Sequence, residues 1–418
     1  MLIGIADAKS FFPTTDNAVN SLINALYIFV IGYAVRPIGG LILGFLSDHW
    51  GRKKILIVSV MLMGISTSII GILPTYETTG SAATLLLLLC RFAQGFAVGG
   101  EYITSITFLI EHADKKEKGF MGSWGAFGVN LGNLIASLFS TVVIYYISQS
   151  ILPSWSWRLV FLITIIGAWI GLWVRIKSSE TLPFIRENVI ETNTILREHC
   201  SNIFNVLYAN KKNSLLIIVL TSLGTCATYL IYLYGPLHAV TFHGMNLWKA
   251  LLINSMSVIL LTILIPFFGH LGDLYGKKIL LLISSSMLLF LAYPFFWAIS
   301  YGSLMAFLSI QMVMSIAVAI FHSLAPVLIV EIIPVKTRCT ISGFLYGISA
   351  SIFGASSPII SLYLIKYTGN YTSPAYYLLI FSLIALLTIS CLLKENKKQK
   401  NTMPISIALK NVDIHSCK

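Results

Sequence analysis

The chain carries a series of long apolar blocks, and these limit what it can fold into more than any other feature. A helix rises about 1.5 Å per residue, so about 20 apolar residues cross the ~30 Å hydrocarbon core of a bilayer. Only 11% of the residues are charged and 56% are hydrophobic, whereas soluble domains carry about 25% charged residues. This composition excludes a soluble enzyme and a disordered chain, and no run of short alternating segments suggests a membrane β-barrel. The sequence predicts an all-α polytopic membrane protein.

The apolar blocks predict eleven transmembrane spans, divided into five and six by one long polar stretch. The spans are expected at residues 21–46, 54–74, 82–110, 119–147, 156–176, 214–235, 250–269, 279–299, 303–330, 340–365 and 376–394. The division predicts an N-terminal bundle over 1–176, a loop between bundles over 177–213, a C-terminal bundle over 214–394 and a tail over 395–418.

Positive charge is distributed unevenly between the two sides of these spans. Of the 28 Lys and Arg residues, 22 lie on the side of the long loop and the tail, and four lie on the opposite side. Because cytoplasmic loops carry the excess of Lys and Arg, the long loop and the C-terminal tail are expected in the cytoplasm. The net charge of +12 therefore reflects topology, and its scatter over short segments gives no reason to expect a nucleic-acid partner.

The six cysteines form no close pair, and none stands near a His cluster. The sequence therefore predicts no disulfide framework, no metal site and no cofactor. There is also no phosphate-binding Gly-x-x-x-x-Gly-Lys loop, and no motif of a serine hydrolase. We expect neither an ATP-driven pump nor an enzyme.

An internal repeat relates the two halves of the chain. The motif Gly44-x-x-x-Asp48-x-x-Gly51-Arg52 recurs, 225 residues later, as Gly269-x-x-x-Asp273-x-x-Gly276-Lys277. A second pair follows, in which Glu111 precedes Lys118 by seven residues and Glu331 precedes Arg338 by seven. Two motifs in the same order indicate two homologous halves, each with two short basic turns on the cytoplasmic side.

These turns have the composition of a clasp between helices. Glycine permits close helix approach and a positive φ, and an aspartate can cap a helix N-terminus and favour its positive end. The basic residues can bridge to acidic groups at other helix ends, so we expect a clasp that holds in one conformation and releases in another. A positively charged loop with a turn glycine explains a single copy as well, but two copies at matched spacing favour the clasp. The predicted clasp residues are Gly44, Asp48, Gly51, Arg52, Glu111, Gly269, Asp273, Gly276, Lys277, Glu331 and Arg338.

The repeat also predicts that one helix is missing. The second half has two spans before its motif, 214–235 and 250–269, whereas the first half has one. Residues 1–20 are interrupted by Asp7, Lys9 and Pro13 and are too short to span. We therefore expect a first half without helix 1, and a gap beside the helix over 82–110.

The first turn, ending in Gly51-Arg52-Lys53-Lys54, resembles the signature of the major facilitator superfamily. The stretch Arg91-Phe-Ala-Gln94-Gly95-Phe-Ala-Val-Gly99-Gly100-Glu101 is similar to the metabolite:proton symporter branch, above all to its proline and glycine-betaine transporters. The resemblance covers about residues 10–394. The chain departs from the branch by starting after the helix 1 motif, and its tail lacks the heptads of a coiled coil.

This resemblance implies a two-bundle fold and a monomer in a bacterial inner membrane. It implies a secondary active transporter that moves a small zwitterion or organic acid with a proton, by alternating access. The bilayer, protons and a small-molecule substrate would be its partners. The missing helix leaves a rival open, a non-transporting remnant or membrane scaffold of the same family.

Charged side chains inside predicted spans are the first candidates for function, because such groups are costly in lipid. Glu101 is the predicted proton-coupling residue, with a packing ion pair as the alternative. Arg91 and Arg36 are predicted to bind a substrate carboxylate, or to belong to structural ion pairs. Arg91 and Glu101 lie about 15 Å apart along one helix and cannot touch.

Polar and aromatic residues complete the predicted substrate site. Gln94 and Asn130 are the polar candidates. Tyr229 and Tyr232 are expected to form aromatic walls for a quaternary amine by cation–π contact. Interface anchors or core packing are the alternative for these tyrosines, and a satisfied core histidine is the interpretation of His322.

Overall fold

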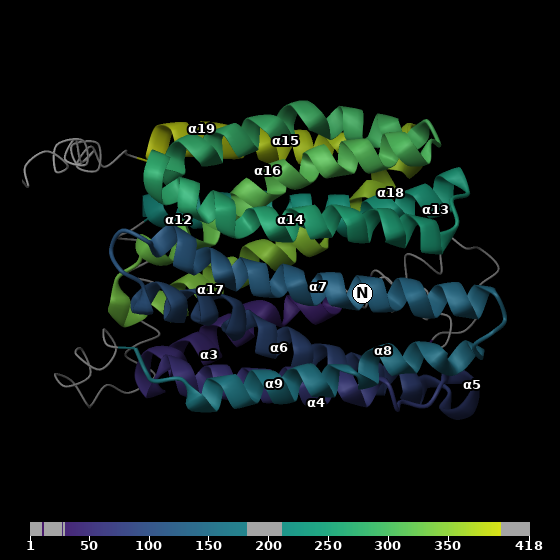
Figure 1. Cartoon of the computed structure of the whole chain (residues 1–418), viewed down its shortest axis with the longest axis horizontal. Coiled ribbons are helices and arrows are strands. Elements are labelled where there is room, and N and C mark those ends of the chain that lie inside the picture. The colour runs from purple at the N-terminus through teal and green to yellow at the C-terminus, as the bar shows by residue number, and fades with distance from the viewer. Residues whose placement is uncertain (1–10, 12–26, 28–29, 182–210, 394–418) are drawn as a thin grey trace, which may run out of the picture.

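The structure is a computed structural model, and it describes residue 11, residue 27 and the ranges 30–181 and 211–393. Helices run side by side along the longest axis of the molecule (Figure 1). The described residues contain eleven helices that are long and apolar enough to cross a membrane, which confirms the predicted number. The interruption by Asp7, Lys9 and Pro13, and most of the predicted loop over 177–213, lie outside the described residues.

The described part of the first half contains seven α-helices, whose bounds lie close to the predicted spans. They are α3 (Arg36–Trp50), which continues a helical stretch from Val30, α4 (Arg52–Ile70), the short α5 (Tyr76–Thr79), α6 (Ser81–His112), α7 (Lys118–Ser148), α8 (Arg158–Leu162) and α9 (Thr164–Lys177) with α8 and α9 forming one span.

The second half contains α12 (Lys211–Thr228), a π-helical segment (Tyr229–Tyr234), α13 (Gly235–His243), α14 (Leu247–Tyr275), α15 (Lys277–Ser300), α16 (Leu304–Glu331), α17 (Arg338–Ser349), a second π-helical segment (Ala350–Ala355), α18 (Ser357–Thr368) and α19 (Pro374–Leu392). The first π-helical segment joins α12 to α13 in one span, and the second joins α17 to α18.

The most extensive packing between the described parts of the two halves is that of α3 on α17 and of α7 on α14. Glycines let the first pair approach closely, because a Cβ at Gly40 would lie 2.4 Å from the carbonyl oxygen of Gly343. A Cβ at Gly347 would likewise lie 2.8 Å from Cα of Pro37. The interface between α3 and α17 is therefore backbone against backbone, which requires small residues.

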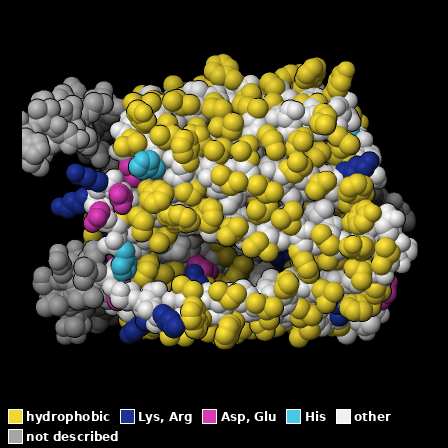
Figure 2. All heavy atoms as spheres, viewed as in Figure 1, with side chains coloured by type: hydrophobic (Ala, Val, Ile, Leu, Met, Phe, Trp, Pro, Cys, Tyr) yellow, Lys and Arg dark blue, Asp and Glu magenta, His cyan; other side chains and the backbone are white. Residues whose placement is uncertain are grey.

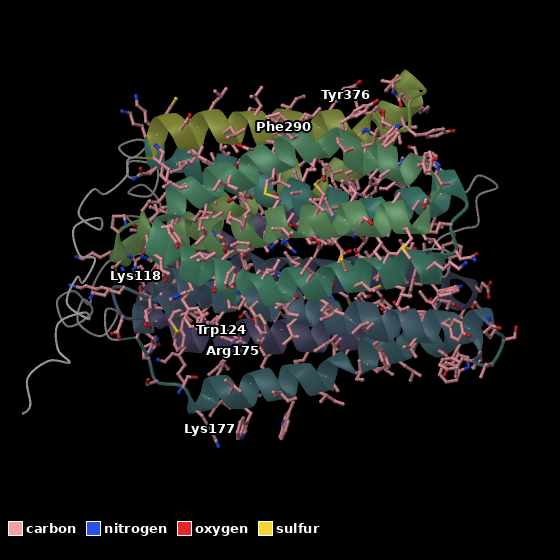
Figure 3. The ribbon with its side chains drawn as sticks, turned by 45° about the horizontal axis from the view of Figure 1, so that its top comes forward. Lys118, Trp124, Arg175, Lys177, Phe290 and Tyr376 are labelled. Atoms are coloured by element: carbon pink, nitrogen blue, oxygen red, sulfur yellow. The ribbon has the colours of Figure 1, made fainter. Side chains whose placement is uncertain are left out.

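Burial differs sharply between helices. Most residues of α16 are buried inside the protein, whereas α9 contains no buried residue. Hydrophobic side chains cover the flank seen in Figure 2, and charged side chains gather mainly at its two ends. Figure 3 shows Phe290 and Tyr376 on the outside of the second half, with exposed fractions of 76% and 48%. This distribution suits a protein whose flank faces lipid.

Candidate functional site

Asp48, in the last turn of α3, caps the N-terminus of α17 in the other half. Its buried carboxylate accepts hydrogen bonds from the backbone N–H groups of Cys339 and Thr340, at 3.2 and 2.9 Å, and from the Thr340 hydroxyl at 2.7 Å. These amides belong to the first turn of α17, where donors have no partner in the helix. The negative charge also faces the positive end of the helix dipole.

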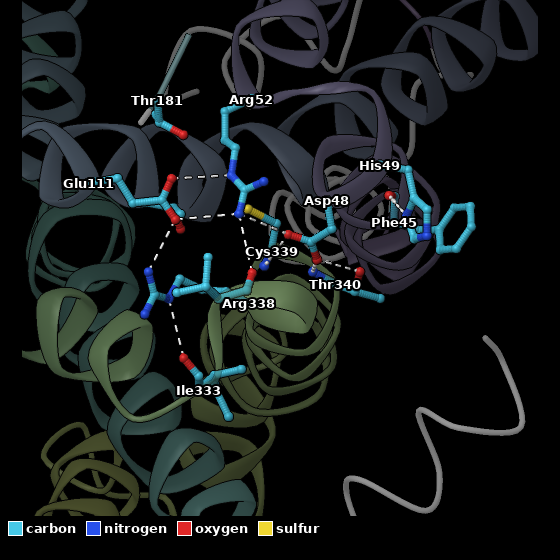
Figure 4. Close-up of polar contacts among 12 residues, drawn as sticks. Phe45, Asp48, His49, Arg52, Glu111, Thr181, Ile333, Arg338, Cys339 and Thr340 are labelled. Carbon is cyan, nitrogen blue, oxygen red and sulfur yellow. Dashed lines mark hydrogen bonds and ion pairs between the residues drawn. The ribbon is translucent and has the colours of Figure 1, made fainter. Parts of the chain in front are cut away.

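A buried cluster of charges stands beside this cap (Figure 4). Arg52 lies between two carboxylates, with its Nε 3.3 Å from Glu111 and its Nη2 3.5 Å from Asp48. Arg338 of the second half donates to Glu111 at 3.1 Å. The Arg52 and Glu111 side chains are each only 2% exposed. Two cations and two anions compensate each other, as buried charges require. We call this group, with the α17 cap, the first clasp.

The second clasp repeats the arrangement with the halves exchanged. Asp273, near the end of α14, accepts hydrogen bonds from the N–H groups of Gly119 and Phe120 in the first turn of α7, both at 2.8 Å. Glu331 forms an ion pair with Lys277 and contacts Lys118 at 4.0 Å. The Glu331 side chain is 24% exposed, so the second clasp is more open to water than the first.

Glycines provide the turns and the close approach in both clasps. Gly51 and Gly276 end α3 and α14 with φ of +108° and +95°, a region that favours glycine. A Cβ at Gly44 would lie 2.7 Å from the Cys339 carbonyl oxygen, and one at Gly269 would lie 2.5 Å from the Ser123 hydroxyl. Every predicted clasp residue therefore stands at one end of the molecule, which we call the clasp end.

A third symmetric contact ties each half together at the clasp end. Lys53 donates to the carbonyl oxygen of Ile176 at 2.8 Å, at the end of α9. Lys278, 225 residues later, donates to the carbonyl oxygens of Leu393 and Ser390, at 2.6 and 3.1 Å, at the end of α19. Each lysine thus caps the C-terminus of the last helix of its own half.

A cavity of about 720 Å³ lies between the halves and is lined by side chains of both. It contains five of the predicted substrate-site and proton-coupling residues, namely Arg36, Glu101, Asn130, Tyr229 and Tyr232. Figure 2 shows a hollow on the flank with acidic and basic side chains inside it. A Cβ at Gly128, which lines the cavity on α7, would meet no atom within 4 Å. The cavity borders α6, the helix beside which the sequence predicts a gap.

Arg36 and a group of tyrosines form one wall of this cavity. The guanidinium carbon of Arg36 lies 3.5 Å from the ring centre of Tyr33, and the Tyr229 hydroxyl donates to the Tyr33 hydroxyl. Tyr102 and Tyr346, with ring centres 5.0 Å apart, line the same cavity. Sequence reasoning found Arg36 and Tyr229 but missed the other three tyrosines. The Nε of Arg36 is buried and has no hydrogen-bond partner among the described residues.

Glu101 has a charged partner that the sequence analysis did not select as a site residue. Arg175 lies in the last turn of α9, and its Nη2 is 2.6 Å from Oε1 of Glu101 on α6. Both side chains line the cavity. Trp124 lines the same cavity, whereas Lys177 points outward from α9 (Figure 3). The sequence analysis selected Arg36 and Arg91 as the basic candidates inside the spans and missed Arg175, although the predicted span over 156–176 contains it.

Arg91 and Gln94 are not among the residues that line the cavity. Arg91 donates to the Gln94 side-chain oxygen at 3.1 Å, and Gln94 donates to the Thr67 hydroxyl of α4 at 2.7 Å. This polar chain joins α6 to α4. Their assignment to the substrate site stays a prediction.

Other polar residues of the cavity have partners within the protein. Asn130 donates to the Ala126 carbonyl oxygen of its own helix at 2.8 Å, and Tyr232 donates to the Ser315 hydroxyl at 2.8 Å. His322 lies 2.8 Å from the Thr228 hydroxyl and also lines the cavity. No group of three or more His, Cys, Asp or Glu residues in the described part of the chain is placed to hold a metal.

Comparisons with known proteins agree with this geometry. The family profile described as Major Facilitator Superfamily matches residues 11–264 and 250–406. A glycine betaine/proline/ectoine/pipecolic acid transporter of Dickeya dadantii is 33% identical over 416 residues, which cover 96% of this chain and 81% of that protein. A proline/betaine transporter of Escherichia coli is 30% identical over 397 residues, covering 92% of this chain and 78% of that protein.

Solved structures with the same fold include the xylose transporter of Escherichia coli, in a partially occluded inward-open conformation. It superposes with a TM-score of 0.71 at 16% identity, and the match covers 95% of this chain and 94% of that one. At this level of identity the likeness concerns the fold alone.

Proposed function

This chain belongs to the Major Facilitator Superfamily, and from that premise we propose that it is a proton-coupled symporter for a small zwitterion or organic acid of the proline and betaine kind. It is a multi-pass membrane transporter and not an enzyme. The observation that carries the proposal is the cavity between the halves, because it holds an arginine, a set of tyrosines and an acidic residue together.

In the proposal, Arg36 and the tyrosines bind the substrate. A guanidinium pairs well with a carboxylate through parallel hydrogen bonds, and the unpartnered Nε of Arg36 supplies one donor. The rings of Tyr229, Tyr232 and Tyr346 can face the cationic group of the substrate. A quaternary ammonium group has no N–H to donate, but it is still attracted to an aromatic face by cation–π interaction. A small zwitterion carries its carboxylate and its ammonium group close together, so it can contact Arg36 and the tyrosines at the same time.

In the same proposal, Glu101 carries the proton and the clasps set the conformation. Both clasps are formed here, so the clasp end is closed in this structure. Release of both caps would let the halves separate at that end and expose the cavity there, which is alternating access. The unequal distribution of Lys and Arg supports a cytoplasmic clasp end. The proposal places the protein in a bacterial inner membrane and has it act as a monomer.

The test is uptake of labelled proline, glycine betaine or α-ketoglutarate into proteoliposomes with an imposed pH gradient. We expect uphill uptake of at least one of them in the wild type. Glu101→Gln should abolish this uptake and retain exchange of labelled for unlabelled substrate, because exchange needs no net proton movement. Accumulation by Glu101→Gln at the wild-type level would refute the proton role. Failure of both uptake and exchange in the wild type would favour the non-transporting rival.

A further inference from the structure

The ion pair between Glu101 and Arg175 joins two helices inside the cavity. Its atoms Oε1 and Nη2 are 2.6 Å apart, and the two side chains are 20% and 22% exposed. Among the described residues that line this cavity, the other charged or titratable groups are Arg36, His322, Tyr33, Tyr102, Tyr229, Tyr232 and Tyr346. Among the described charged side chains of the cavity, Arg175 is therefore the one that forms an ion pair with Glu101.

Gly171 allows Arg175 to reach this position. The two residues are four apart on α9, and a Cβ at Gly171 would lie 3.3 Å from Nη1 of Arg175. The guanidinium therefore folds back along its own helix over a residue with no side chain, away from the helix end and the water there. Helical side chains lean toward the N-terminus, which favours this direction. Lys177, two residues further on, instead places its ammonium 4.0 Å from the ring centre of the exposed Trp173.

We propose that Arg175 is a positioning residue for proton coupling. Its guanidinium keeps the Glu101 carboxylate ionised until a proton arrives, and it later favours release of that proton from Glu101. This inference rests on the proposed function, since it requires Glu101 to carry the transported proton. An ionised carboxylate away from water needs a counter-charge. When Glu101 takes up a proton, the attraction to Arg175 falls and the pair can separate. When the proton leaves, the pair forms again and stabilises the empty carboxylate.

The proposal predicts a defect of proton release in Arg175→Gln. Without the guanidinium, Glu101 holds its proton more firmly, so net uptake with a lumen at neutral pH should fall. We expect a fall of about tenfold or more, because proton release changes tenfold for each pH unit. Exchange should persist, because the protonated carrier can bind and return substrate. Raising the pH of the proteoliposome lumen should restore net uptake in Arg175→Gln. Arg175→Lys retains a charge and should show the wild-type dependence on lumen pH.

Two further variants separate this role from plain packing. Gly171→Val retains the charge of Arg175 but fills the space under its guanidinium, so it should shift the dependence on lumen pH in the same direction as Arg175→Gln. Lys177→Gln removes an equal charge from the same helix and should leave uptake unchanged. Should Arg175→Gln fail to fold, Gly171→Val provides the measurement.

The results distinguish failure of this inference from failure of the proposed function. If Glu101→Gln abolishes proton-driven uptake while Arg175→Gln and Gly171→Val depend on lumen pH as the wild type does, Arg175 has no part in coupling and the inference is overturned. A combined Glu101→Gln and Arg175→Gln variant with full proton-driven uptake would show that the pair only packs helices. If Glu101→Gln alone accumulates substrate normally, the proton role of Glu101 itself is wrong.

Discussion

Replacing Asp48 by alanine should open the clasp end by an amount that follows from the structure. The carboxylate accepts two backbone hydrogen bonds in the first turn of α17. Loss of such a cap costs about 0.5–2 kcal/mol, and loss of the favourable charge at the helix end costs about 0.3–1 kcal/mol. Glu111 remains paired with Arg52 and Arg338. A total of about 1–3 kcal/mol against the closed state corresponds to a 5- to 150-fold shift of the equilibrium.

Cys339 offers a reporter inside the clasp. Its amide is one of the two that Asp48 binds, and the residue is only 1% exposed. A maleimide can reach the thiol only when α17 leaves α3. The measurement is the rate of Cys339 labelling in a background in which the other accessible thiols are serines. Cys90 and Cys226 are buried and can stay, whereas Cys391 is exposed and is replaced, together with Cys200 and Cys417.

The labelling rate should rise 5- to 150-fold in Asp48→Ala, in proportion to the open population. Asp273→Ala removes the corresponding cap of α7 and should shift the rate in the same direction, because both clasps close the same end. Asp114→Ala is the matched control, since it removes an equal charge from an exposed position between α6 and α7. Labelling of Asp48→Ala at the wild-type rate would refute the view that the cap stabilises the closed state.

Three other outcomes follow from the packing and the cavity. Gly99→Ala should lower the melting temperature strongly, because its Cβ would lie 2.3 Å from the Arg36 carbonyl oxygen. Gly128→Ala is the control. Its Cβ would meet nothing within 4 Å, so it should leave the melting temperature unchanged or raise it slightly. Arg36→Gln should weaken calorimetric binding of a carboxylate substrate by about tenfold or more, while an analogue without the carboxylate binds equally to both proteins. Tyr229→Phe removes the hydroxyl bonded to Tyr33 but retains the ring, so equilibrium binding of a quaternary amine should persist, and its loss would assign recognition to the hydroxyl.

The sequence predicts the helices well because they rest on local patterns. Span length follows from the run of apolar residues, and the repeat at a spacing of 225 residues identifies Asp48 and Asp273 as equivalent. It does not reveal which helix each aspartate caps. That partner lies in the other half of the chain, some 290 residues away for Asp48 and some 150 for Asp273, and no local pattern encodes contacts of that kind.

Residues of the cavity were harder to predict, for two physical reasons. Arg175 stands at the edge of an apolar run, where a charge is normally assigned to the loop, but a long side chain on a helix can reach back one turn. Tyr33, Tyr102 and Tyr346 stand among many apolar residues, and only the packing of α3, α6 and α17 brings their rings into one wall. Arg91 shows the opposite case, since a charge inside a span was satisfied by Gln94 of its own helix.

No residue of α9 is buried inside the described protein, although this helix carries Arg175. Within the described part of the protein, most of its surface therefore faces outward, where a bilayer would bring lipid chains against it. A helix held in this way adjusts its tilt to the hydrocarbon thickness of the membrane, and the 24-residue segment Ser154–Lys177 is long enough to tilt. Tilting moves Arg175 relative to Glu101. The length of the lipid acyl chains would therefore change the distance between the guanidinium and the carboxylate. The composition of the bilayer would then adjust how firmly this transporter holds its proton.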